Sequence, residues 1–160
     1  MADTESHPRL ADGELVLRPR RPGDAAAIAA LLAEPEVGRW WPDGEADDDG
    51  WVIEVDGAFA GWLQACEEPG EWFPSVALDI GLTTALHGRG YGRRALRLAI
   101  EHFRARGHHR FTIDPETANA RAIRCYRAVG FEPVGVMRAY MRDPHGGWSD
   151  GLLMDLVFLD

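Results

Sequence analysis

The stretch from residue 78 to residue 131 constrains the fold of this chain more than any other part of the sequence. An apolar strand pattern ends in His87-Gly88-Arg89-Gly90-Tyr91-Gly92, and a helical repeat of apolar residues follows up to Gly107. Three glycines between a strand and a helix predict a loop with unusual backbone angles and close backbone approach. The helix directs unpaired amides and the positive end of its dipole toward that loop, which suits a diphosphate. A plain turn that starts a helix would explain the same glycines.

Two common phosphate-binding motifs do not fit this loop. A Walker loop ends in Gly-Lys-Ser/Thr, whereas Gly92 is followed by Arg93. A dinucleotide fingerprint has the spacing Gly-x-Gly-x-x-Gly, whereas the glycines here are Gly88, Gly90 and Gly92. An anion site at this loop would therefore belong to another class.

The second half of the stretch places polar side chains at the end of a strand and on a helix. Residues 109–114 read as a strand, and Pro115 keeps Asp114 extended. Asp114 is therefore either the N-cap of the next helix or a functional carboxylate. That helix ends at Gly130, and Tyr126 lies at the edge of its apolar stripe.

Asp79 lies in the strand that precedes the glycine loop. Residues 75–82 alternate, so that Asp79 shares a face with Ala77 and Gly81 rather than with the larger apolar residues. A carboxylate in an apolar strand needs partners, and it is either a structural hydrogen-bonding group or a functional one. Its small neighbours leave room for a ligand, which favours a function.

These motifs together resemble the GNAT superfamily of N-acyltransferases. The loop is similar to the family's pyrophosphate loop, Gln/Arg-x-x-Gly-x-Gly/Ala, with His87 in the Gln/Arg position. The stretch from Asp114 to Phe131, with Asn119, Cys125-Tyr126 and Gly130-Phe131, resembles the aminoglycoside 6′-N-acetyltransferase branch and its siderophore-acylating relatives. The resemblance covers roughly residues 14–158.

The resemblance implies acetyl-CoA as the co-substrate, no metal, and a set of site residues. Tyr126 would donate a proton to the departing thiolate, and Asp79 and Asp114 would contact the amine of the acceptor. Backbone amides near residues 78–80 would stabilise the oxyanion. The cofactor-binding residues that it implies are Ile80, Leu82, His87, Gly88, Arg89, Gly90, Gly92, Arg93 and Asn119.

The order of the predicted elements indicates a mixed α/β domain. The predicted strands are 14–18, 51–55, 58–65, 75–82, 109–114, 131–137 and 151–158. The predicted helices are 25–32, the segment from the glycine loop to Gly107, and the segment between Pro115 and Gly130, and residues 35–42 form a short helix or a turn. The resemblance implies one sheet of about seven strands with two splayed parallel strands at its centre, flanked by about four helices. We expect residues 1–12 to form a polar tail and residues 13–160 to form the domain.

Charge and composition narrow the partners. The formal net charge of −9 argues against nucleic acid and favours a cationic small molecule. Nine acids and one Arg lie between residues 34 and 56, next to Trp40 and Trp41, which either bind a polycationic sugar or contribute at least one ring to the core. Polar residues at the start and the lack of a membrane-length apolar run predict a cytoplasmic protein. Cys66 and Cys125 suggest neither a disulfide framework nor a zinc site.

Several functions remain open at this point. The leading hypothesis is acetyl-CoA-dependent acetylation of an aminoglycoside-like polyamine. Acylation of a siderophore precursor, N-terminal acetylation of a protein or peptide, and a non-catalytic acyl-CoA-binding module are the alternatives. The sequence does not distinguish a monomer from a homodimer.

Overall fold

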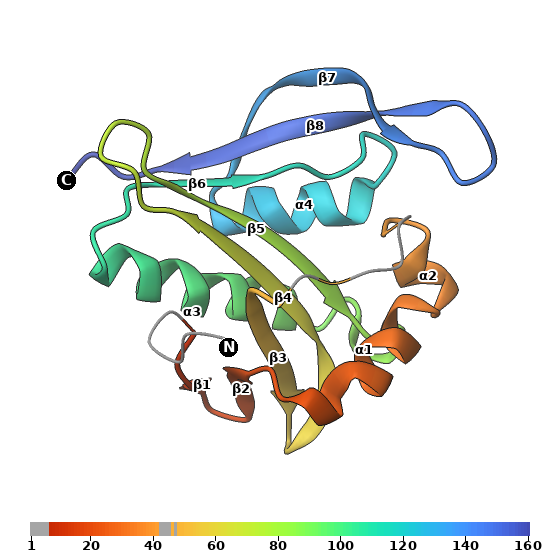
Figure 1. Ribbon diagram of the computed structural model, residues 1–160, viewed down its shortest axis with the longest axis vertical. Helices are drawn as coiled ribbons and strands as arrows, with labels where there is room; N and C mark the ends of the chain where they lie inside the picture. The colour runs from red at the N-terminus through yellow and green to blue at the C-terminus, as the bar shows by residue number, and fades with distance from the viewer. Residues whose placement is uncertain (1–6, 42–45, 47) are drawn as a thin grey trace.

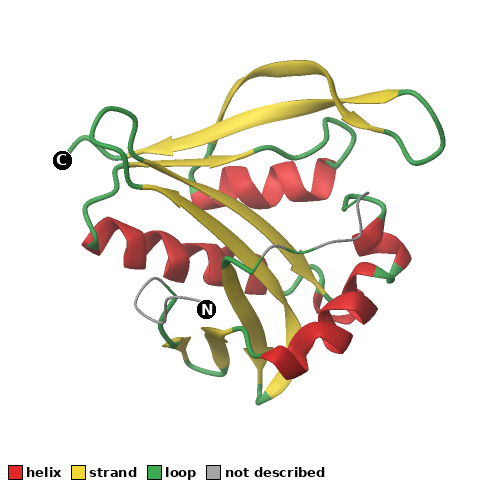
Figure 2. Cartoon of the chain, in the orientation of Figure 1, coloured by secondary structure: helices red, strands yellow, loops and turns green. Residues whose placement is uncertain are grey.

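The computed structural model describes residues 7–41, 46 and 48–160 of the chain. The elements in chain order are β1 (Leu10–Asp12), β2 (Leu15–Pro19), η1 (Pro22–Asp24), α1 (Ala25–Leu32), α2 (Pro35–Gly38), β3 (Gly50–Val55), β4 (Ala58–Glu68), β5 (Ser75–Leu82), η2 (Thr84–Leu86), α3 (Tyr91–Ala105), β6 (Arg110–Ile113), α4 (Ala120–Val129), β7 (Glu132–Arg142) and β8 (Trp148–Val157). In the described part of the chain the strands form one eight-stranded sheet in the order β1-β2-β3-β4-β5-β6-β8-β7 (Figures 1 and 2). The predicted mixed α/β domain is confirmed.

The centre of the sheet is open. β5 and β6 are its parallel pair, and they are joined only through Val76 with Phe111 and Ala77 with Thr112. Beyond Ala77, β5 continues to Leu82 along β4, whereas β6 ends at Ile113. The predicted divergence of the two central parallel strands is thus confirmed, and it leaves the second half of β5 without a partner on one side (Figure 1).

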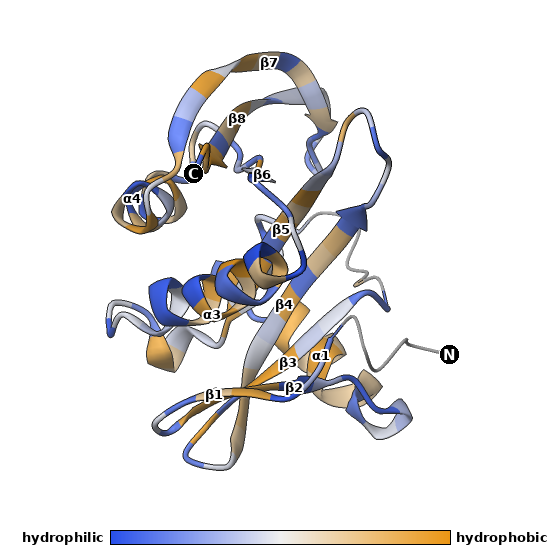
Figure 3. Ribbon diagram, turned by 90° about the vertical axis from the view of Figure 1, so that its left-hand side faces the viewer, coloured by the Kyte–Doolittle hydropathy of each residue, from blue (hydrophilic) through white to orange (hydrophobic). Residues whose placement is uncertain are grey.

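Helices cover both faces of the sheet. The apolar stripe of α3, which includes Leu96, Ile100 and Phe103, is buried in one cluster with Trp51 and Ile53. Because side chains alternate along a strand, Val52 points the other way, into a second cluster with residues of α1. Figure 3 shows α3 and α4 on one side of β4 and β5, with α1 on the other side.

The N-terminal segment is more ordered than the sequence suggested. The ring of His7 is 6% exposed, and the Trp51 indole donates a hydrogen bond to the Pro8 carbonyl at 2.8 Å. Residues 10–12 form β1, which pairs antiparallel with β2. The expected polar tail of residues 1–12 is therefore wrong from residue 7 onward, and β1 is the strand in excess of the predicted seven. Residues 1–6 lie outside the described residues.

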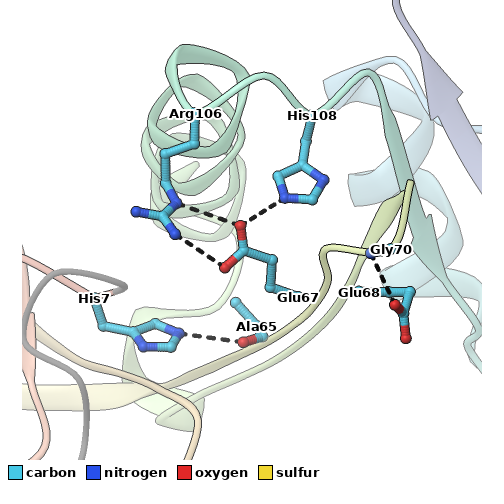
Figure 4. Close-up of polar contacts among 7 residues, drawn as sticks. All are labelled: His7, Ala65, Glu67, Glu68, Gly70, Arg106 and His108. Carbon is cyan, nitrogen blue, oxygen red and sulfur yellow. Dashed lines mark hydrogen bonds and ion pairs between the residues drawn. The ribbon is translucent and has the colours of Figure 1, made fainter. Parts of the chain in front are cut away.

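A charged cluster closes the end of the sheet that lies away from the glycine loop. Glu67 on β4 accepts hydrogen bonds from Arg106 at 3.2 and 3.3 Å and pairs with the ring of His108 at 2.6 Å (Figure 4). These contacts tie the segment that follows α3 to β4. They give the Glu67 carboxylate, the exposed Arg106 and the buried His108 a structural role.

Candidate active site

A pocket of about 950 Å³ lies where β5 and β6 diverge. Its wall is formed by α2 with Trp40 and Trp41, by residues 79–82 of β5, by the glycine loop with the start of α3, and by residues 113–126. Tyr140 and Met141 of β7 complete it. The pocket therefore contains the glycine loop, both predicted carboxylates and Tyr126.

The glycine loop has the geometry of an anion site. Gly88 and Gly90 have φ angles of +77° and +84°, a region that favours glycine, and Gly90 is the N-cap of α3. The Arg94 amide bonds to the Gly90 carbonyl at 3.2 Å, so the amides of residues 91–93 precede the helical ladder. A Cβ at Gly92 would lie 3.4 Å from Sγ of Cys125, which shows how closely α4 packs on the loop.

His87 fixes this loop instead of standing free in it. Its Nε2 hydrogen-bonds the Leu82 carbonyl at 2.8 Å, and its Nδ1 contacts the guanidinium of Arg121. Since Arg121 can only donate, Nδ1 accepts and Nε2 carries the proton. His87 thus joins the end of β5 to the start of α4. Arg121 was missed because a sequence gives no sign that α4 begins beside the loop.

The remaining predicted cofactor residues divide into two groups. Ile80, Leu82, Arg93 and Asn119 all line the pocket, whereas Arg89 is exposed and outside its lining. Asn119 also caps α4, because its side-chain oxygen accepts from the Ala122 amide at 3.3 Å. Arg124, which the sequence did not single out, lines the pocket as well.

Asp114 is not a helix cap, which corrects one of its two interpretations. α4 begins only at Ala120, and Asn119 takes the capping position. The segment after Asp114 instead bonds to β8: the Pro115 carbonyl accepts from the Leu152 amide at 2.8 Å, and the Thr117 amide donates to the Asp150 carbonyl at 3.0 Å. The Asp114 carboxylate is thereby left in the pocket, where it accepts a hydrogen bond from the hydroxyl of Tyr140.

Asp79 lies on the half of β5 that is paired with β4 and has no strand neighbour on the β6 side, and it is opposite Gln64 of β4. Its side chain is exposed and lines the pocket, and its Oδ1 accepts from the Ile80 amide at 2.9 Å. In this structure the Ile80 amide, which lies in the segment expected to stabilise the oxyanion, therefore donates to Asp79. The carboxylate of Asp79, between the small neighbours Ala77 and Gly81 on its face of the strand, is thus accessible from the pocket.

Tyr126 is the most deeply buried polar side chain of the pocket, with 5% of its surface exposed. Burial raises the pKa of its phenol well above the ordinary value, and the negative charges of Asp79 and, to a smaller extent, Asp114 raise the pKa further. The hydroxyl is therefore protonated at neutral pH, and both carboxylates are near enough for their charges to affect its pKa.

The two adjacent tryptophans have different environments. Trp41 is 9% exposed and packs in the second core cluster against α1, so it is the core ring that the sequence left as one alternative. Trp40 is half-buried, with the guanidinium of Arg39 4.3 Å from its ring centre. Both line the pocket. The acids Asp43, Glu45 and Asp47 lie outside the described residues.

Charge is divided along the pocket. Glu36 and Glu116 join Asp79 and Asp114 among its lining residues, and Arg93, Arg121 and Arg124 line it beside the glycine loop and α4. An anionic molecule at the loop and a cationic molecule at the carboxylates would each meet the opposite charge.

Comparison with known proteins decides the family. The sequence profile of the acetyltransferase (GNAT) family matches residues 21–131, which is more than half of the chain. The chain belongs to the GNAT family. The matched stretch includes the glycine loop, both carboxylates and Tyr126.

Relatives of this acetyltransferase act on different acceptors. It is 30% identical over 125 residues to an L-methionine sulfoximine/L-methionine sulfone acetyltransferase of Pseudomonas paraeruginosa, covering 74% of this chain and 69% of that protein. It is 28% identical over 148 residues to the streptothricin acetyltransferase of Streptomyces lavendulae, covering 84% and 77%. The structure of Mycobacterium smegmatis RimJ in complex with CoA-disulfide superposes with a TM-score of 0.77 at 26% identity, covering 89% and 81%.

The chain is an acetyl-CoA-dependent N-acetyltransferase. The glycine loop and the start of α3 fit the cofactor, because they present backbone amides and the positive end of a helix to a diphosphate. Among the described residues, no group of three or more His, Cys, Asp or Glu side chains could hold a metal ion. Within the same residues, no helix is both long and apolar enough to span a membrane.

Proposed function

We propose that this acetyltransferase acetylates a primary amine of a cationic small molecule in the cytoplasm, and that the acceptor is an aminoglycoside modified at its 6′-amine. The observation that carries the proposal is the placement of Asp79 and Asp114 in the same pocket as Tyr126 and the glycine loop. Two carboxylates at the reacting end of the pocket favour an acceptor with ammonium groups. Antibiotic defence is the physiological role that this acceptor would imply.

Each group in the pocket has a chemical task in this proposal. Acetyl-CoA supplies the thioester that the amine attacks. Asp79 and Asp114 bind the acceptor as an ammonium ion, which gives up its proton through water because an ordinary carboxylate is a weak base toward an alkylammonium. Tyr126 donates its phenol proton to the departing sulfur and regains a proton that the nitrogen loses.

Two further carboxylates in the lining of the pocket support a polycationic acceptor. Glu36 on α2 and Glu116 after β6 line the same pocket, so its described lining contains carboxylates besides Asp79 and Asp114. Aminoglycosides carry several ammonium groups on linked rings and could contact carboxylates at more than one place. The streptothricin acetyltransferase among the relatives supports a small-molecule acceptor.

N-terminal acetylation of a protein is the second candidate. The likeness to RimJ, in both sequence and fold, favours it. A peptide amine would also meet Asp79 and Asp114 as an ammonium group, so the two candidates differ in what the outer pocket binds.

A substrate panel tests the proposal. The protein is mixed with acetyl-CoA and an acceptor, and release of CoA is followed with a thiol reagent. We expect turnover of aminoglycosides that carry a 6′-amine and none of matched compounds that carry a 6′-hydroxyl. Spermidine, amino acids and peptides with free N-termini complete the panel. Turnover of peptides without turnover of any aminoglycoside would overturn the proposal in favour of the second candidate.

Replacing Asp79 tests the role of the pocket carboxylates. We expect Asp79→Asn to raise the KM for the amine by about tenfold, which corresponds to the loss of one charge-assisted hydrogen bond. The KM for acetyl-CoA should change much less, because the substitution leaves the glycine loop unaltered. Asp56→Asn makes the same charge change in the β3–β4 turn and serves as the control. An unchanged amine KM in Asp79→Asn would remove Asp79 from acceptor binding.

A further inference from the structure

Asp114 receives a hydrogen bond from a strand that the sequence does not connect with the active site. Tyr140 lies on β7, 26 residues after Asp114, and its hydroxyl donates to Oδ2 of the carboxylate. Its ring lines the pocket and is 47% exposed. The contact joins the acceptor end of the pocket to the edge strand of the sheet.

The backbone of β7 departs from regular pairing at the position of Tyr140. Met137 pairs with Gly151 and Met141 pairs with Ser149, so three residues of β7 face a single residue of β8 between these pairs. Ala139 has a φ of +51°, which is unfavourable for a residue with a Cβ. Its amide donates to Oδ1 of Asp150 at 2.8 Å, which holds the irregular backbone in place. Bulges of this kind often turn a side chain toward an active site.

The partner strand makes room for the ring. A Cβ at Gly151 would lie 2.7 Å from Cδ1 of Tyr140 and 3.2 Å from Cε of Met137. Any side chain at residue 151 would therefore displace the Tyr140 ring or its neighbours. The bulge, the left-handed Ala139 and the glycine opposite all fix where the phenol lies, and a backbone that stores strain beside a pocket indicates a functional constraint.

Asp114 needs such a partner because of its place in the chain. It follows the last residue of β6 and precedes Pro115, which has no amide to donate, and it is not a helix cap. The negative charge of Asp114 raises the pKa of both Tyr126 and Tyr140, and so does that of Asp79, which places the two carboxylates in one small region. Like charges repel, so Asp114 would turn away from Asp79 unless another group held it.

We propose that Tyr140 is a positioning residue, whose hydroxyl holds the Asp114 carboxylate in the orientation that receives the ammonium group of the acceptor. The inference rests on the proposed function in one respect, since it takes the acceptor to be an amine bound at Asp114. The hydrogen bond to Asp114, together with burial, raises the pKa of Tyr140 to about 12, so the phenol keeps the proton that it donates throughout the working range of an enzyme.

Kinetics of Tyr140→Phe test the role directly. This variant keeps the ring against Gly151 and removes only the hydroxyl. We expect the KM for the amine to rise by about tenfold, with kcat changed by less than about threefold and the KM for acetyl-CoA unchanged. In Tyr140→Phe combined with Asp114→Asn, the amine KM should equal that of Asp114→Asn alone, because both changes remove one interaction.

A second variant reaches the same contact from the other strand. Gly151→Ala keeps the phenol but displaces the ring, and we expect the same selective rise in the amine KM. Trp148→Phe, at an exposed ring on the same strand, is the control and should match the wild type. An unchanged amine KM in Tyr140→Phe, or additive effects in the double variant, would overturn the inference.

A measurement without an acceptor separates this inference from the proposed function. The protein has three tyrosines, so carbon NMR of tyrosine labelled at the phenol carbon can follow each one, with Tyr140→Phe giving the assignment. In Asp114→Asn we expect Tyr140 to ionise at a lower pH than in the wild type. Suppose that no aminoglycoside is acetylated, but Asp114→Asn lowers the pH at which Tyr140 ionises and Tyr140→Phe raises the KM for another amine of the panel. Then only the proposed acceptor is wrong. If Asp114→Asn leaves the Tyr140 titration unchanged, the positioning role is wrong whatever the acceptor.

Discussion

Tyr126 differs from an ordinary tyrosine because it is buried within the electrostatic range of two carboxylates. Desolvation disfavours the phenolate, and the charges of Asp79 and Asp114 disfavour it further, so its pKa lies well above the ordinary value. A group that must give a proton to a thiolate has to hold that proton beforehand. The same environment would return a proton to the phenol quickly after the transfer.

The first prediction concerns this proton. We expect Tyr126→Phe to lower kcat by about tenfold or more, because general acid catalysis contributes at least that much, while the KM for acetyl-CoA stays nearly constant. The ring remains against Phe131, so the fold should be kept. Steady-state kinetics with an acceptor from the panel give both values. A kcat equal to that of the wild type would remove Tyr126 from the chemistry.

The sequence identified some site residues and missed others for a physical reason. Asp79, Asp114 and Tyr126 stand in local patterns, a strand face, a strand end and a helix stripe, and the structure brings all three into one pocket. Tyr140 stands beyond residue 137, where the predicted strand ended, in a bulge that no periodicity marks. Its partner Asp114 is 26 residues earlier, and such a pairing depends on the register of β7 against β8.

At the level of the elements, the loop before α3 depends on left-handed backbone at two glycines. Gly90 has a φ of +84° and is the N-cap of α3, so it sets the direction of the first helical amides. Gly57, in the β3–β4 turn, has a φ of +79° and lies in open space. These two glycines have the same backbone constraint and different surroundings, which makes them a matched pair.

The second prediction uses this pair. Both Gly90→Ala and Gly57→Ala should lower the free energy of unfolding by about 1 to 2 kcal/mol, the cost of a Cβ in the left-handed region. Only Gly90→Ala should raise the KM for acetyl-CoA, by about an order of magnitude, because the amides that face the diphosphate move. Urea unfolding and cofactor titration measure the two effects. Equal cofactor affinity in both variants would contradict the role of the loop.

Local signals predicted the elements that have a strong period or a turn of fixed chemistry. The stripe of α3 and the Asp56-Gly57 turn between β3 and β4 were both visible in the sequence, and both residues of that turn have positive φ. The late start of α4 was not visible in the sequence, where Asp114 was the candidate cap, whereas Asn119 caps the helix. β1 was missed because three residues with one large apolar side chain give no strand pattern. The segment is a strand because it pairs with β2.

For the whole molecule, ion pairs hold distant segments to the core. Arg94 on α3 bonds to Asp12 and Glu14 at 2.7 Å, which attaches the β1–β2 hairpin to the helix that follows the glycine loop. The guanidinium lowers the pKa of Glu14 to about 2. The pKa values of Asp24, through its bond with Arg18, and of Glu67, through His108 and Arg106 against the effect of burial, are also lowered. The ion pairs of Glu14, Asp24 and Glu67 should therefore all weaken as the pH falls.

The third prediction is the pH dependence of stability. Each of these carboxyl groups has a lower pKa in the folded state than in the unfolded state, so below about pH 4.5 the unfolded state binds more protons and stability falls as the pH falls toward 2. Tyr126 has the opposite sign: its pKa is raised on folding, the unfolded state loses the proton first, and stability falls as the pH rises above about 10. We expect urea unfolding to show a plateau between these limits.

Two variants assign the limbs of this profile to named groups. Arg94→Gln removes the partner that lowers the pKa of Glu14, so its stability should fall less steeply between about pH 4.5 and 2 than that of the wild type. Tyr126→Phe removes a phenol with a raised pKa, so its alkaline limb should be shallower, while Arg94→Gln keeps that limb. Parallel profiles for all three proteins would show that neither the hairpin ion pair nor the buried phenol governs the response of the fold to pH.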